Sequence, residues 1–117
     1  MGLIEECAQN RLEYLEDRVG TLKLQQMKAL SDSSVEGRAR YYEISADLSH
    51  IERKISELRK ALEEPYSFDA RNPLREALRE ERTRLLEKLD NENDPEKKNE
   101  IQNRYIEISN AINTISA

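Results

Sequence analysis

The sequence predicts an all-α protein whose four helices form two antiparallel helical hairpins, packed as an elongated bundle or coiled coil. Three observations support this fold class. Apolar residues recur at alternating spacings of three and four over long stretches of the chain. Charged residues make up 37 % of the 117 residues, which equals the hydrophobic fraction, and there is no Trp and a single Phe. Such a composition is typical of long exposed helices and not of a sheet protein.

The clearest apolar stripe lies between residues 41 and 62. Its members follow a heptad spacing without a break: Tyr41, Ile44, Leu48, Ile51, Ile55, Leu58 and Leu62. A stripe of this kind is the side of a helix that packs against another helix. It predicts a helix over 34–63, which ends before Pro65 because a proline disfavours helical geometry at the preceding residue.

A matching stripe precedes it and predicts a helix over 3–30. Its members are Ile4, Ala8, Leu12, Leu15, Val19, Leu22 and Ala29, and Gln26 interrupts it near the end. The segment SDSSVEG then breaks the pattern, and Ser33 with Glu36 predicts a capping box at the start of the next helix. So short a connection makes the two helices antiparallel neighbours.

The second hairpin is predicted over 73–117, after a linker at 65–72, and packs on the first hairpin (1–64) within one domain. Asn72–Pro73 and Asp94–Pro95 each predict an N-cap followed by a first-turn proline. The apolar stripes are Leu74, Leu78, Leu85 and Leu89, then Ile101, Tyr105, Ile108, Ile112 and Ile115. At about 1.5 Å per residue these helices are roughly 15 Å shorter than the first pair. Part of the long hairpin is therefore expected to project.

Further apolar residues lie behind the main stripes. In the second helix these are Val35, Ala39, Tyr42 and Ala46, and in the first they are Leu3, Cys7 and Tyr14. By the helical period the first set points opposite the main stripe. One interpretation is scattered surface residues, which are common. The other is contact with the second hairpin or with a second subunit, which makes Tyr42 and Ala46 candidate interaction residues.

The last thirteen residues, YIEISNAINTISA, hold one charge and have poor helix propensity. We expect this segment to be docked, within the chain in preference to a groove of a partner.

Four arginines of the third helix share one side: Arg71, Arg75, Arg79 and Arg82. Three glutamates fall on another side: Glu76, Glu80 and Glu87. The favoured interpretation is that the arginine stems flank the core and pair with glutamates of a neighbouring helix. The alternative is a ridge, with Arg75 and Arg79 as candidates, for an acidic partner or a phosphate backbone. The interleaved glutamates count against that alternative.

The linker aromatics Tyr66 and Phe68 are a further candidate pair. We expect them to fold back and close the end of the bundle. The alternative is that they anchor a partner protein.

The chain offers little for catalysis. It has one Cys and one His, Cys7 and His50, and lacks a phosphate-binding glycine loop, a zinc spacing and a Glu-x-x-His pair. We therefore predict no catalytic residue, cofactor, metal or small-molecule substrate, and no enzyme. The net charge of −5 makes a nucleic-acid partner unlikely on sequence grounds. A lone Cys and the absence of a membrane-length apolar run predict a cytoplasmic protein with no membrane partner.

These observations favour a non-enzymatic structural or interaction module, an assembly or adaptor protein. It would present helix faces to another copy of itself or to a helical partner protein. The alternative function is a small nucleic-acid-associated protein that uses the arginine ridge of the third helix.

Overall fold

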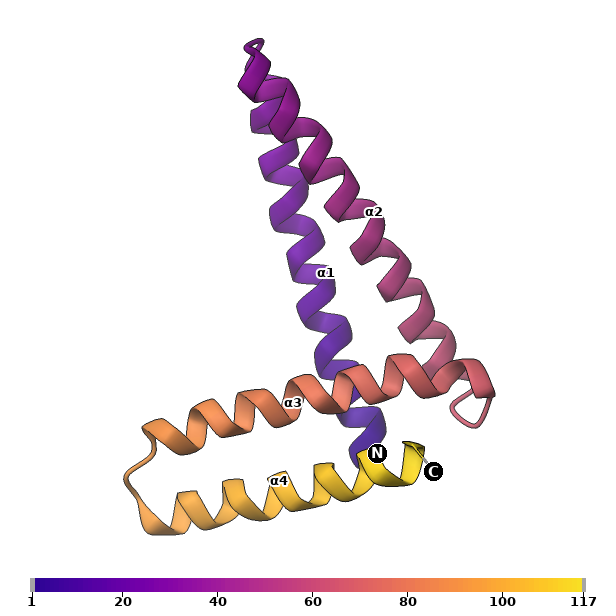
Figure 1. The fold of residues 1–117 in the computed structure, drawn as a ribbon, viewed down its shortest axis with the longest axis vertical. Helices are drawn as coiled ribbons and strands as arrows, with labels where there is room; N and C mark the ends of the chain where they lie inside the picture. Colours follow the sequence, from indigo (N-terminus) through magenta and orange to yellow (C-terminus); the bar gives the residue numbers. More distant parts are fainter. Residues whose placement is uncertain (1, 117) are drawn as a thin grey trace.

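The computed structural model describes residues 2–116 and confirms the predicted fold class. Within this range there are four α-helices and one short 3-10 helix: α1 (Leu3–Leu30), α2 (Val35–Glu63), η1 (Phe68–Ala70), α3 (Arg71–Asn91) and α4 (Pro95–Ser116). Figure 1 shows α1 and α2 as one antiparallel hairpin and α3 and α4 as a second.

The second hairpin lies across one end of the first and not alongside it (Figure 1). It meets the long hairpin where α1 begins and α2 ends, and the molecule measures 53 × 40 × 21 Å. The far part of the long hairpin therefore projects, as expected. The cause differs from the expected one, since the crossing direction of the hairpins, more than their lengths, leaves the tip uncovered.

The apolar core divides into three clusters along this shape. At the crossing, α1, α2 and α3 share the buried residues Ala8, Leu12, Leu15, Ile55, Leu58, Ala61, Ala70, Leu74 and Ala77. Between α3 and α4 lie Leu78, Leu85, Ile108 and Ile112, joined by Cys7 of α1. The projecting tip is held by α1 and α2 alone, through Leu22, Ala29, Ile44 and Leu48.

The C-terminal segment docks within the chain, as expected from its few charges. Ile108 and Ile112 are buried against α3, and Ile115 packs at the crossing. Gln26, which interrupts the stripe of α1, donates a hydrogen bond from Nε2 to Ser45 Oγ of α2 at 3.0 Å. A polar residue on the packed side is thus satisfied across the two helices.

Two of the predicted helix caps are wrong. The capping box at Ser33 and Glu36 does not form, because Ser34 is the N-cap and its Oγ accepts from the Gly37 N–H at 3.1 Å. Asp32 Oδ1 accepts from the Ser34 N–H at 2.9 Å. Hydrogen bonds with the Ser34 side chain and backbone hold the pKa of Asp32 below its ordinary value.

Asn72 is not an N-cap either, because α3 continues directly from η1 and begins at Arg71. Asn72 lies in the first turn, where its Oδ1 accepts from Arg75 Nη1 at 3.2 Å. The fourth helix begins as predicted: Asp94 Oδ1 accepts from the Glu96 N–H at 3.0 Å and Pro95 opens the helix.

Two glycines give opposite expectations for the same substitution. A Cβ at Gly37 would lie 2.5 Å from the Asp32 carbonyl oxygen, whereas a Cβ at Gly20 would meet nothing within 4 Å. Gly37→Ala should lower the free energy of unfolding by about 1–3 kcal/mol through overpacking. Gly20→Ala should raise it by about 0.5–1 kcal/mol through helix propensity. Urea unfolding followed by circular dichroism measures both, and two effects of the same sign would contradict this description of the turn.

Candidate interaction surfaces

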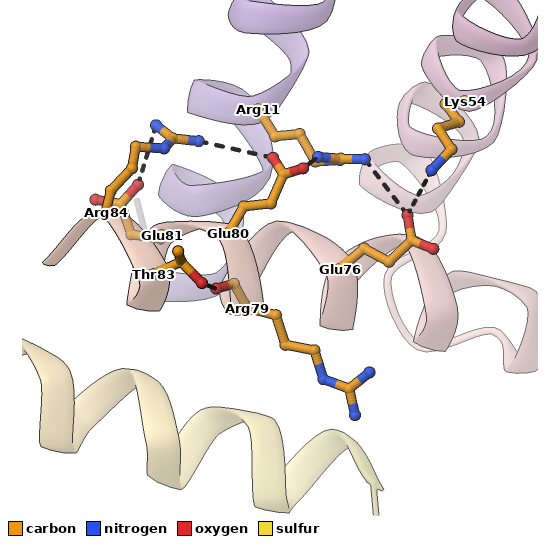
Figure 2. Close-up of polar contacts among 8 residues, drawn as sticks. All are labelled: Arg11, Lys54, Glu76, Arg79, Glu80, Glu81, Thr83 and Arg84. Atoms are coloured by element: carbon orange, nitrogen blue, oxygen red, sulfur yellow. Dashed lines mark hydrogen bonds and ion pairs between the residues drawn. The ribbon is translucent and has the colours of Figure 1, made fainter. Parts of the chain in front are cut away.

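Arg11 is the buried charged residue at the crossing of the hairpins, with 5 % of its surface exposed. Its Nη2 lies 3.4 Å from Glu76 Oε2 on α3, and its Nη1 forms an ion pair with Glu80 one turn further along. Lys54 Nζ of α2 reaches the same Glu76 oxygen at 3.5 Å (Figure 2). One guanidinium, one ammonium group and two carboxylates thus connect three helices.

Sequence reasoning missed Arg11, although a signal was present. Arg11 lies one turn after Cys7 and one turn before Leu15, so it belongs to the apolar side of α1. A guanidinium buried on that side requires an anionic partner, because an unpaired buried charge is very costly. The sequence could therefore predict that Arg11 pairs with a carboxylate, but not that the carboxylates are those of Glu76 and Glu80.

The predicted pairing of the α3 arginines is wrong, and the roles are reversed. Helix α3 supplies the carboxylates, while α1 and α2 supply the cations. Arg84 of α3 adds contacts to Glu80 at 3.8 Å and Glu81 at 3.4 Å. Among residues 2–116, the recorded ion pairs include none of the four ridge arginines, which are Arg71, Arg75, Arg79 and Arg82.

The candidate residues Tyr42 and Ala46 lie on what we call the outer face of α2: Val35, Ala39, Tyr42 and Ala46. Val35 is 78 % exposed, Tyr42 is 71 % exposed, and both alanines are exposed. Helix α3 packs at the opposite end of α2, so the second hairpin leaves this face uncovered (Figure 1). Exposed apolar side chains continue on the same tip of α1 at Leu24, Met27 and Leu30.

The off-stripe residues of α1 differ from those of α2 in their burial. Leu3 and Cys7 pack against the cluster between α3 and α4, whereas Tyr14 is exposed. Contact with the second hairpin, one of the two interpretations, thus holds for two of these three residues and for none on the outer face of α2.

The linker aromatics do not close the end of the bundle, so that expectation is wrong. Tyr66 is 101 % exposed and Phe68 is 80 % exposed, and the small Ala70 enters the core instead. The chain turns tightly here, since the Ser67 N–H donates to the Glu64 carbonyl at 3.1 Å and η1 follows at once. Too little chain remains to fold an aromatic ring inward. Phe68 lies under the Arg71 guanidinium, 5.4 Å from the ring centre.

Cys7 and His50 lie in different environments. Cys7 is fully buried, and this burial, reinforced by the Glu81 carboxylate, raises the pKa of its thiol from 9.0 to about 11. His50 is exposed on α2. In the part of the chain that the structure describes, no group of three or more His, Cys, Asp or Glu side chains is placed to hold a metal ion.

Comparison of this chain with protein-family models, with curated proteins and with solved structures finds no match. Among the described helices, none combines the length and the apolar character needed to cross a membrane.

Arg11→Ala should lower the free energy of unfolding by about 2 kcal/mol. It removes a buried charge that joins α1 to α3, while Glu76 keeps its contact with Lys54 and Glu80 keeps its contact with Arg84. The carboxylates are about half exposed, which keeps the loss below that of a fully buried pair. Arg18→Ala, at an exposed position of the same helix, serves as the control and should change stability by less than about 0.5 kcal/mol. Equal losses in urea unfolding would argue against a special role for Arg11.

The Cys7 thiol should report whether the hairpins are docked. Near pH 8, a thiol reagent should label the native protein far more slowly than the urea-unfolded protein, because the thiol is buried and stays protonated. Between pH 9 and 11 the unfolded state loses the thiol proton while the folded state keeps it. The free energy of unfolding should therefore fall by about 2–3 kcal/mol over this range, relative to Cys7→Ala. Fast labelling of the native protein would show that the junction is open.

Proposed function

We propose that this protein is a non-enzymatic structural or interaction module that associates through the outer face of α2. The observation that carries the proposal is the exposure of Val35 and Tyr42 on a helix face opposite the main stripe. A helix packed on one side normally carries polar residues on the other. Four apolar residues at helical spacing on the solvent side form a surface suited to another helix.

The thinness of the projecting tip supports this proposal. Only four residues form the buried core there, all of them from α1 and α2. A two-helix layer buries little apolar surface and gains stability when a further helix covers it. The exposed residues Leu24, Met27 and Leu30 of α1 extend the apolar surface of the same tip. Association at the tip would therefore complete a structure that the second hairpin leaves incomplete.

We infer that the first occupant of the outer face is a second copy of the chain. Tyr42 lies between two small residues, Ala39 one turn before it and Ala46 one turn after it. When two such helices pair about a two-fold axis, the large ring of one copy faces the small residues of the other. A single patch is then complementary to itself, which is the requirement for a symmetric dimer.

Tyr42→Glu should convert the associated protein to a monomer without loss of helicity. The substitution places a charge at the centre of the proposed interface, where burial would be costly, and at a position that is exposed in the single chain. Light scattering on a sizing column, at several protein concentrations, gives the mass. Asn103→Glu adds the same charge at an exposed site on α4 and should leave the mass unchanged.

Ile51→Asp provides the contrasting variant, since Ile51 packs against the core clusters at the crossing and the tip. It should reduce helical circular dichroism, whereas Tyr42→Glu should not. A wild-type protein that is monomeric at every concentration would contradict self-association and direct the search to a helical partner protein. A Tyr42→Glu variant that associates like the wild type would remove the outer face of α2 from the proposal.

A further inference from the structure

The hairpin of α3 and α4 has one side that is turned away from α1. In Figure 1 this side faces the viewer, and α1 passes behind α3. On α3, Leu78 and Leu85 pack toward α4. The ridge arginines lie next to these leucines around the helix, by the helical period. On α4, Arg104 contacts Glu6 of α1 at 3.1 Å and so marks the side that faces α1. The opposite side of α4 carries the polar residues Lys98, Gln102, Ser109 and Asn113.

Arg75, Arg79 and Arg82 lie at the centre of this surface by the helical period, and we call it the arginine face. Arg79 is exposed, whereas Arg75 and Arg82 are half-buried. Figure 2 shows the Arg79 side chain extending away from the Arg11 ion pairs, on the side of α4. Arg71 is set apart, because it lies over Phe68 and borders a hollow shared with Glu5.

The two glutamates of α3 nearest to Arg75 and Arg79 are already paired, and the exposed Asp90 falls on the same side only two turns beyond Arg82. Glu76 is engaged by Arg11 and Lys54, and Glu80 by Arg11 and Arg84. Glu80 and Arg79 line one hollow together with Tyr14 of α1. Both carboxylate oxygens of Glu80 nevertheless contact cations, one on Arg11 and one on Arg84. On α4 the acidic residues fall on the far side by the helical period: Glu96, Glu100 and Glu107. Over residues 75–82 the ion pairs thus draw the two glutamates toward α1 and leave three arginines on another side of α3, on a chain of net charge −5.

We propose that the arginine face binds the phosphodiester backbone of a nucleic acid. Guanidinium groups pair with phosphate oxygens through two parallel hydrogen bonds. The three arginines span roughly 10 Å of helix, a length over which one DNA strand presents about three phosphates. On the neighbouring helix α4, the hydroxyl and amide groups of Ser109, Gln102 and Asn113 are donors of kinds that commonly contact phosphates.

A helical protein partner fits this face less well than a phosphate backbone. Recognition of a helix requires a row of apolar anchors at spacings of three and four. Here the large apolar residues that stay exposed are Leu86 on α3 and Ile106 on α4, on separate helices. The arginine face lies on the second hairpin, whereas the outer face of α2 lies on the first. Nucleic-acid binding and self-association can therefore be tested independently.

Fluorescence anisotropy with a short labelled DNA duplex tests the proposal, using the full chain at low salt. Binding should weaken as salt rises, with a slope of log affinity against log salt near −3 for about three phosphates contacted. The double variant Arg75→Gln with Arg79→Gln should bind at least about tenfold more weakly and lower the magnitude of the slope by about 2. Circular dichroism checks that this variant stays folded.

Arg18→Gln with Lys23→Gln is the matched control, since it removes two positive charges from exposed positions of α1. It should retain wild-type affinity. The proposal is overturned if the wild type does not bind DNA at low salt, or if the control loses as much affinity as the double variant. Binding of polyglutamate or of anionic lipid vesicles through the same arginines, without binding of DNA, would also overturn it.

Discussion

The burial of the Arg11 guanidinium is the constraint on which the arrangement of the two hairpins depends. Arg11 sits on the apolar side of α1, where a charge is tolerated only beside carboxylates. Glu76 and Glu80 of α3 meet it one turn apart, and Lys54 of α2 shares the first of them. Because both glutamates must face α1 at this point, the position and the rotation of α3 across the first hairpin are fixed together.

Two surfaces follow from that crossing. Placing α3 and α4 across one end of the long hairpin leaves the other end as a two-helix tip, with the outer face of α2 uncovered. Rotating α3 so that its glutamates face α1 turns Arg79 away from the ion pairs (Figure 2). By the helical period, Arg75 and Arg82 lie on the same side as Arg79. The ion pairs that join the hairpins thus also separate the charges of α3. Cys7, at the same junction, packs directly against the second hairpin.

Features governed by local interactions were predicted well from the sequence. The bounds of α1 and the start of α4 at Asp94 and Pro95 follow from apolar spacing and capping chemistry within a few residues. The errors arose where several local solutions compete. Ser34 caps α2 in place of Ser33, because Asp32 holds the turn through the Ser34 N–H. Tyr66 and Phe68 stay outside because the turn before η1 leaves no chain to bring them in.

The sequence by itself determined four amphipathic helices in two hairpins, since the 3.6-residue period and the turn residues act over short distances. It also placed apolar residues on the outer side of α2. Only the tertiary structure decided which charges are neutralised. In the sequence, the arginines and glutamates of α3 are interleaved. Their separation depends on Arg11, more than sixty positions earlier in the chain, and no spacing within α3 encodes that contact.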